Sequence, residues 1–373
     1  MNAPVSNVIR VGILGMVKHD YIPNAFANHP RFKIVCVADD SDRPHWTHER
    51  NQSYASKLNI PYLKDPEEAF VMYSLDAAII CSEAERHCNL AIRAAQAGLH
   101  LVIDKPLSTH LDQCDKLIDV INKSGVCSLV WNRNFLPSVL QAKSIIEKGD
   151  IGSLVSIHCD FYFAKDAGPP LRIENDNTQP INWLDRQLEA HADGSDGGVG
   201  IEPIGELQIE GIYPLAYIHY LANGALAEKV FTCMKTHFHQ AHFDNNVDDL
   251  SSISLQYEGN FTATVCLGRI GNHAHPDIGE IKIHIVGTSG SAVISEARPE
   301  ISVYSRNQSN KEFKNMRIAN DNDKLLVDNM AQAIDSHKET ILDALDARNI
   351  CAAIQAAIHS GKSGEIVEVN HRA

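Results

Sequence analysis

The chain lacks the features that mark several large classes of protein. Its nine cysteines contain no CxxC pair and fall mostly inside apolar runs, so neither a disulfide framework nor a zinc knuckle is indicated. Thirty-three Lys and Arg stand against 47 Asp and Glu, a net charge of −14, and no basic stripe occurs, which argues against nucleic acid or an anionic membrane as partner. No apolar run reaches the roughly 18 residues of a membrane span, and no secretory pattern opens the chain. We expect a cytoplasmic protein with reduced thiols.

What is present is the composition of a folded protein with more than one core. Hydrophobic residues make up 44% of the 373 positions and charged residues 21%. A chain of this length exceeds one ordinary core, so two domains are expected. We place the boundary between residues 131 and 132.

Residues 1–131 alternate apolar runs of strand length with amphipathic runs. Strands are expected at 8–15, 32–38, 77–81 and 99–103, with helices between them. This alternation predicts an α/β domain with a doubly wound parallel sheet, whose ligands bind beyond the carboxyl ends of the strands.

The first strand, turn and second strand have the order of a dinucleotide-binding half. Gly15 ends the first strand, and Asp39 follows the second, 24 positions later. A carboxylate there accepts hydrogen bonds from the adenosine ribose and repels a 2′-phosphate, which favours NAD over NADP. The glycine motif itself is incomplete, because Val17 and Asp20 occupy its second and third glycine positions. Taken alone, the loop predicts only a strand-to-helix turn.

Residues 132–373 are richer in strands. Strand-like runs occur near 154–163, 229–239, 250–257, 261–268 and 280–286. They predict an α+β domain with an open, mainly antiparallel sheet, and the two closing helices near 324–337 and 346–360 are candidates to pack back on the first domain. An open sheet needs its outer face covered, so we expect a homodimer or homotetramer.

Several longer motifs together point to one family. They are the strand and loop at 76–87, the segment GLHLVIDKP at 98–106, NRNFLP at 132–137, GDIG at 149–152 and GIYPL at 211–215. In these motifs and in its order of elements, nearly end to end, the chain resembles the Gfo/Idh/MocA oxidoreductases. It departs from them at Cys81-Ser82-Glu83, where the family carries Thr-Pro-Asn, and at Ile209, where the family carries Asp.

The resemblance implies an NAD-dependent oxidoreductase acting on a secondary hydroxyl of a sugar, polyol or related cyclic alcohol. It makes Lys105 and Tyr213 the expected catalytic residues, with Arg133, Trp183 and Tyr213 facing the substrate. The expected cofactor-binding residues are Gly15, Met16, Val17, Asp39, Cys81, Ser82, His87, Asp104, Lys105 and Asn132.

Other readings stay open. The chain is alternatively a dinucleotide-binding sugar sensor or corepressor without turnover, or a lyase or glycosidase that uses NAD transiently. Without the motif, Lys105 is a surface lysine after a strand, and Tyr213 is a half-buried tyrosine. His237, His239 and His242, with His273 and His275, invite a metal site, but no tight ligand spacing completes one. We expect polar residues on a sheet face there, and no metal.

Overall fold

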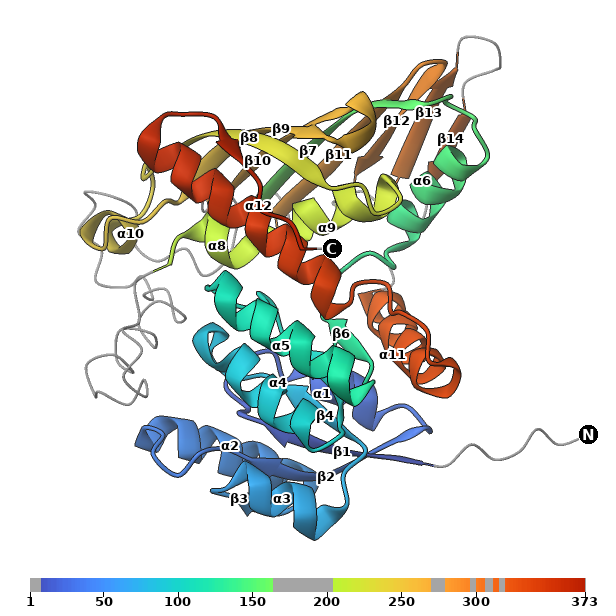
Figure 1. Ribbon diagram of the computed structural model, residues 1–373. Helices are drawn as coiled ribbons and strands as arrows, with labels where there is room; N and C mark the ends of the chain where they lie inside the picture. The colour runs from blue at the N-terminus through green and yellow to red at the C-terminus, as the bar shows by residue number, and fades with distance from the viewer. Residues whose placement is uncertain are drawn as a thin grey trace, which may run out of the picture. The chain divides into compact units, whose positions relative to one another are not determined.

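The computed structural model describes residues 8–163, 204–269, 279–295, 300–305, 311–314 and 319–372. These residues form two compact units, whose elements are labelled in Figure 1. Of the described residues, the first unit holds those up to Asn132 together with Asp323–Arg348, and the second unit holds the others.

The first unit is built on a six-stranded parallel sheet in the order β3-β2-β1-β4-β5-β6. Its strands are β1 (Ile9–Leu14), β2 (Phe32–Ala38), β3 (Tyr62–Leu63), β4 (Ala77–Ile80), β5 (His100–Ile103) and β6 (Ser128–Val130). The helices between them are α1 (Tyr21–Ala27), α2 (His45–Leu58), α3 (Pro66–Tyr73), α4 (His87–Gln96) and α5 (Leu111–Ser124). This confirms the predicted doubly wound sheet. The strand order reverses between β1 and β4, the switch point where such sheets bind ligands.

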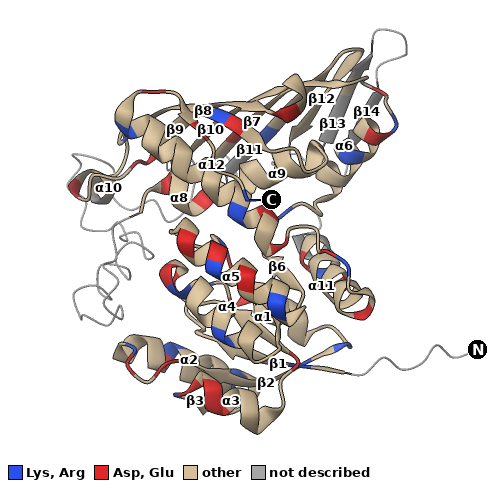
Figure 2. Ribbon diagram, viewed as in Figure 1, with Lys and Arg blue, Asp and Glu red and all other residues tan. Residues whose placement is uncertain are grey.

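Sequence features explain the limits of these elements. All four residues of β4 are buried, as a strand covered on both faces requires. At α3, the Asp65 side chain accepts the Glu68 N–H at 3.1 Å and Pro66 occupies the first turn. The helix α5 ends at Gly125, which adopts the left-handed backbone conformation with φ +69°. Acidic and basic positions are intermixed along α5 in Figure 2.

The second unit contains a nine-stranded sheet in the order β14-β13-β12-β11-β7-β10-β9-β8-β15. All neighbouring strands are antiparallel except β7 and β10, which are parallel. The strands are β7 (Leu154–Phe163), β8 (Ala227–Lys235), β9 (Leu250–Tyr257), β10 (Thr262–Arg269), β11 (Gly279–Gly287), β12 (Gly290–Ser295), β13 (Glu300–Ser305), β14 (Lys311–Lys314) and β15 (Val367–Glu368). The helices are α6 (Pro137–Glu147), α8 (Glu206–Glu210), α9 (Ile212–Leu221) and α10 (Gln240–Asp244), while α11 (Ala319–Ser336) lies mostly in the first unit and α12 (Ala344–Ser363) mostly in the second.

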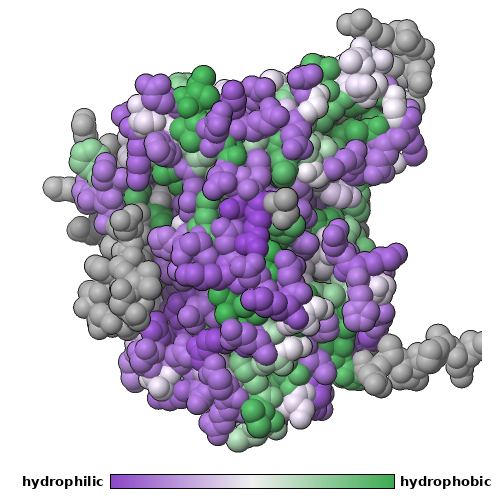
Figure 3. Space-filling view, viewed as in Figure 1, coloured by the Kyte–Doolittle hydropathy of each residue, from purple (hydrophilic) through white to green (hydrophobic). Residues whose placement is uncertain are grey.

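The two faces of this sheet differ. Figure 1 shows α8, α9 and α12 along one face, and no helix of the described residues covers the other. In β9 the residues alternate accordingly: Ile253 and Leu255 are buried, whereas Ser252, Ser254 and Gln256 are exposed. The uncovered face is therefore polar along β9, although Phe231 of β8, opposite Ser254, is 40% exposed. The side of the molecule drawn in Figure 3 is mostly hydrophilic.

The prediction for the histidines after β8 was wrong. The strand ends at Lys235, and the carboxylate of Asp249 accepts the N–H groups of the next turn at His237 (2.8 Å) and His239 (3.0 Å). His239 and His242 are buried, not displayed on a sheet face. His273, His275 and Trp183 lie outside the described residues.

Searches for two further kinds of feature gave negative results. Among the residues that the structure describes, no group of three or more His, Cys, Asp or Glu side chains is arranged to hold a metal ion. In the same part of the chain, no helix is both long enough and apolar enough to cross a bilayer.

Candidate functional site

The loop after β1 is pressed against the end of β4. Gly15 has φ +66°, and a Cβ there would lie 2.7 Å from the Cβ of Ser82. The N–H groups of Val17 and Lys18 both donate to the carbonyl of Cys81, at 3.0 and 3.2 Å. Only glycine combines this backbone conformation with this close approach. The structure therefore brings Gly15, Met16, Val17, Cys81 and Ser82 together at the switch point.

A buried asparagine connects this loop with the acid after β2. The Met16 N–H donates to Asn51 Oδ1 at 2.7 Å, and Asn51 Nδ2 donates to Asp39 Oδ2 at 3.1 Å. Asn51 is fully buried on α2 and also bonds the Thr47 carbonyl. No local pattern around Asn51 signals this role, because both partners are distant in the chain.

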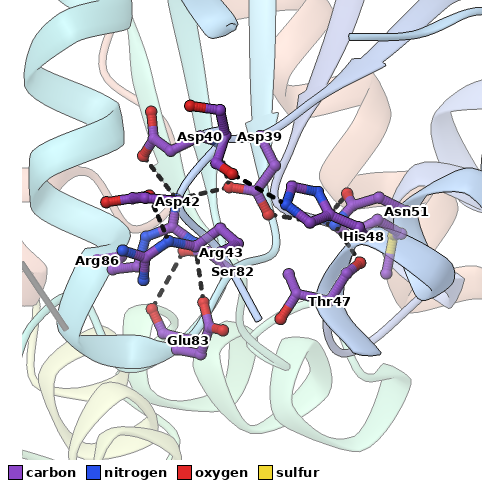
Figure 4. A network of polar contacts seen from close by, with 12 residues as sticks. Asp39, Asp40, Asp42, Arg43, Thr47, His48, Asn51, Ser82, Glu83 and Arg86 are labelled. Carbon is purple, nitrogen blue, oxygen red and sulfur yellow. Dashed lines mark hydrogen bonds and ion pairs between the residues drawn. The ribbon is translucent and has the colours of Figure 1, made fainter. Parts of the chain in front are cut away.

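Asp39 is the centre of a charged network, drawn in Figure 4. Arg86 Nη2 lies 2.5 Å from Asp39 Oδ1 and 2.8 Å from Asp40 Oδ2, and its Nη1 lies 3.1 Å from Glu83 Oε2. Burial raises the pKa of Asp39, and Arg86 partly offsets this. The pKa of Arg86 is itself raised, because its acidic partners outweigh the cost of burying its charge. The two groups are therefore a buried ion pair.

This pair bears on how a dinucleotide would be held. The side chain of Asp39 is fully buried, and its oxygens accept from Arg86, from Asn51 and from the Asp40 N–H at 2.9 Å. An adenosine ribose reaches that carboxylate only if Arg86 turns away. The loop fits a dinucleotide at Gly15, but the N–H groups from Met16 to Lys18 already bond protein acceptors, so a pyrophosphate would be held by other groups of this loop.

The end of β5 places an aspartate and a lysine next to each other. Asp104 Oδ1 accepts the N–H of Lys105 at 2.8 Å, and its Oδ2 lies 2.6 Å from Nδ1 of His19. Although burial disfavours its charged form, His19, His87 and Lys105 together lower the pKa of Asp104. Asp104 is thus an anion at neutral pH, between a histidine and a lysine that are both at the strand-end edge.

His87 joins the loops after β4 and β5. Its Nδ1 lies 2.7 Å from the Pro106 carbonyl oxygen and its Nε2 lies 3.0 Å from that of Ser82. Burial lowers its pKa, so the ring is neutral at pH 7 and donates to one carbonyl at a time. Both nitrogens face protein atoms, and the contribution of His87 to a cofactor site is to hold these loops. Burial also raises the pKa of the Cys81 thiol, which is therefore protonated.

The remaining predicted residues are divided between the units. Asn132 closes the first unit and donates from Nδ2 to the Val130 carbonyl at 2.8 Å. In the second unit, the guanidinium of Arg133 lies over the ring of Tyr213, 5.7 Å from its centroid. The same ring stacks on Phe161, with centroids 5.6 Å apart. Arg133 and Tyr213, the two predicted substrate residues among those described, thus lie together.

The acids that precede Tyr213 are engaged elsewhere. Glu206 Oε1 accepts from Arg269 Nε at 2.7 Å and lies 3.1 Å from His242 Nε2; these partners outweigh burial and lower the pKa of Glu206 to about 2. Glu210 Oε1 accepts from Arg269 Nη2 at 3.2 Å. Both carboxylates are buried ion-pair partners, and Ile209 between them has no proton to exchange.

Comparisons with known proteins agree with this architecture. The family described as "Oxidoreductase family, NAD-binding Rossmann fold" (Gfo/Idh/MocA) matches residues 7–131. The NAD⁺-dependent scyllo-inositol 2-dehydrogenase of Bacillus subtilis is 29% identical over 168 residues, 43% of this chain and 46% of that protein. The chain therefore matches about half the length of this curated relative.

Two solved structures share the fold over nearly the whole chain. An NAD-binding oxidoreductase from Klebsiella pneumoniae has a TM-score of 0.78 at 19% identity, covering 98% of this chain and 100% of that one. A levoglucosan dehydrogenase in complex with NADH and L-sorbose has a TM-score of 0.77 at 16% identity, with the same coverage. At such identities the likeness concerns the fold alone. Residues 7–131, which hold the parallel sheet and its strand-end residues, are thus similar to the NAD-binding Rossmann domain of the Gfo/Idh/MocA oxidoreductases.

Proposed function

We propose that this protein is an NAD-dependent oxidoreductase that transfers a hydride between a nicotinamide and a secondary hydroxyl group. The observation that carries the proposal is the Asp104-Lys105 pair at the end of β5, a strand next to the switch-point strand β4. A site for hydride transfer needs a group at the strand-end edge that binds the hydroxyl oxygen and stabilises the negative charge that develops on it, and the lysine next to a buried carboxylate provides one.

A sugar, polyol or related cyclic alcohol is the substrate class that we propose. Two similar proteins are named for such compounds, the scyllo-inositol dehydrogenase and the levoglucosan dehydrogenase. In the second unit, the guanidinium of Arg133 and the hydroxyl of Tyr213 are groups that suit oxygen-rich ligands.

The cofactor that we propose is NAD rather than NADP, since Asp39 with Asp40 and Asp42 makes the end of β2 acidic. When bound, NAD would supply the hydride acceptor. Gly15 and the loop after it would hold the pyrophosphate, Asp39 would hold the adenosine ribose after Arg86 turns away, and Lys105 would bind the reacting hydroxyl and stabilise negative charge on its oxygen.

The first experiment asks whether the protein turns over at all. The purified chain is tested for co-purified dinucleotide, and a panel of sugars and polyols is then screened for NADH formation. The proposal expects at least one secondary alcohol to be oxidised. Tight NAD binding with no reduction of NAD by any member of the panel would favour a sensor. Ile209 supports this alternative, because it stands where the resembling family carries an aspartate that could carry a proton. Product formation without net NADH would indicate transient oxidation.

The second experiment assigns the role of Lys105. Lys105→Ala should lower kcat by about 100- to 1,000-fold, the usual contribution of a group that stabilises a developing negative charge on oxygen, while the Kd for NAD changes little. Lys116→Ala is the matched control, because Lys116 is an exposed lysine that pairs with Asp112 on α5. Tyr213→Phe should be milder if the tyrosine only positions the substrate, and comparable if it relays the proton. Near-normal turnover of Lys105→Ala would remove this residue from the mechanism.

A further inference from the structure

His19 occupies an unusual place in the loop after β1. Its backbone has φ +51°, in the left-handed region that non-glycine residues seldom adopt and that is concentrated at functional sites. Its Nδ1 lies 2.6 Å from Asp104 Oδ2, which belongs to a segment 85 positions later in the chain. This loop thus places the imidazole of His19 against Asp104, the residue that precedes Lys105.

The carboxylate of Asp104 is fixed before it meets the imidazole. Its other oxygen accepts the Lys105 N–H at 2.8 Å, and the side chain is 1% exposed. An ionised acceptor at 2.6 Å keeps the proton of a neutral imidazole on Nδ1, which leaves Nε2 as the basic nitrogen. The His19 side chain keeps 30% of its surface exposed, so Nε2 belongs to a ring that solvent or a ligand can reach.

Neighbouring groups support this arrangement. The ring of His19 packs on Tyr21 at 5.3 Å between centroids, and Tyr21 lies 6.3 Å from Trp131. The charged or titratable groups of the described residues around the pair include His87, Lys105, Cys81, Asp20 and Tyr21. His87 is neutral because burial lowers its pKa. The Cys81 thiol is protonated because burial raises its pKa. The side chain of His19 is in direct contact with the buried carboxylate of Asp104.

We propose that His19, oriented by Asp104, is the catalytic base of the oxidation and that Lys105 remains a cation which stabilises the substrate oxygen. This assignment rests on the proposed oxidoreductase function. As the C–H and O–H bonds break, the hydride with its two electrons passes to the nicotinamide and the proton passes to Nε2 of neutral His19. The carbonyl double bond forms, and the carboxylate of Asp104 stabilises the imidazolium until its proton is released to water. In the reverse direction, the imidazolium returns the proton.

The test uses a variant that removes the base and keeps the structure. In His19→Asn, the amide nitrogen takes the position of Nδ1 and can still donate to Asp104, and asparagine tolerates a positive φ. The matched control is His29→Asn. His29 also pairs with an aspartate, its Nε2 3.0 Å from Asp328 Oδ1, but it precedes β2 and so lies at the opposite, amino-terminal edge of the sheet.

We expect His19→Asn to lower kcat for alcohol oxidation by about 100- to 10,000-fold at pH 7, with the Kd for NAD within threefold by calorimetry. The wild-type profile of kcat against pH should fall on the acid side, because a protonated imidazole cannot accept the hydroxyl proton, and this limb should disappear in His19→Asn. His29→Asn should keep both the rate and the limb. Long-range ¹H–¹⁵N spectra of the dinucleotide-free protein at pH 8 should show the His19 proton on Nδ1, and Asp104→Asn should weaken that preference.

Different results separate the two proposals. If the wild type oxidises an alcohol and His19→Asn keeps its rate and its acid limb, the role of His19 is refuted while the oxidoreductase stands. A proton on Nε2 at pH 8 would refute it as well. A large rise in the Kd for NAD with unchanged kcat would make His19 a cofactor contact and not the base. If the wild type turns over no alcohol, the proposed function itself fails, and the base assignment fails with it.

Discussion

Replacing Arg86 by glutamine leaves a fully buried carboxylate without its cationic partner. In the wild type, Arg86 Nη2 lies 2.5 Å from Asp39 Oδ1, and the two side chains are 13% and 0% exposed. The variant keeps a polar side chain but removes the charge. We expect a large decrease in the free energy of unfolding.

The structure sets the size of this loss. Breaking a buried ion pair by removing one partner costs about 3–5 kcal/mol, because the remaining charge is uncompensated. Asp39 would keep the bonds from Asn51 Nδ2 and from the Asp40 N–H, so we expect the lower end, about 3 kcal/mol. Arg93→Gln is the matched control. Arg93 and its partners Asp40 and Glu67 are 25%, 25% and 55% exposed, which predicts a loss of about 0–1 kcal/mol.

The loss should also depend on pH, with a definite sign. Burial raises the folded-state pKa of Asp39, and Arg86 holds it lower than burial alone would; in the variant it rises further. An acid with a raised folded-state pKa keeps its proton longer in the folded protein than in the unfolded chain, so stability falls as pH rises through that pKa. The deficit of Arg86→Gln relative to wild type should therefore be smaller at pH 5 than at pH 8.

Urea unfolding of the full chain, followed by far-ultraviolet circular dichroism at both pH values, measures these differences through the transition midpoints. Adding Asp39→Asn to Arg86→Gln should recover most of the lost stability, because the double variant no longer buries the unpaired carboxylate of Asp39. The reasoning is refuted if Arg86→Gln and Arg93→Gln lose equal stability, or if the double variant is no more stable than Arg86→Gln.

Two further predictions concern binding and assembly. NAD should bind more tightly than NADP in calorimetry, since Asp39 and its acidic neighbours would repel a 2′-phosphate at the end of β2; Arg43, whose Nε lies 3.0 Å from Asp42 Oδ1, is the residue most able to overturn this, and equal or tighter NADP binding would contradict it. Light scattering at micromolar concentration should give the mass of a dimer or tetramer, because no described helix covers one face of the nine-stranded sheet, on which Phe231 of β8 is 40% exposed; a monomeric mass would count against that surface as an interface.

Most elements of the fold could be predicted because their signals are local. The buried runs that became β1, β2 and β4 are continuous in the sequence, and Gly125 and Pro66 mark helix limits by their own backbone chemistry. The error at the end of β8 has a non-local cause. His237 and its neighbours have strand-like composition, but Asp249, from the start of the next strand region, takes their N–H groups and turns the chain.

The candidate site was predictable only where a residue's role follows from its position at a strand end. Gly15, Asp39 and Lys105 could be named in that way. Three roles were missed: Asn51 as the link between the loop and Asp39, Arg86 as the ion-pair partner of Asp39, and His19 as the proposed base. Each role depends on a partner 12 to 85 positions away in the chain. An asparagine inside a helix, or an arginine before one, carries no such information in the local pattern.

The incomplete glycine motif illustrates why topology is the better guide to this site. The first glycine is required, because any Cβ at Gly15 would collide with Ser82. The later loop positions have other roles here: the Val17 N–H holds the loop on Cys81, and His19 reaches Asp104. A motif describes one way of shaping the loop, whereas the strand order determines which strand ends adjoin it. The chemistry at β4 and β5 can therefore persist while the loop takes on residues, such as an imidazole, that a glycine-rich sequence does not offer.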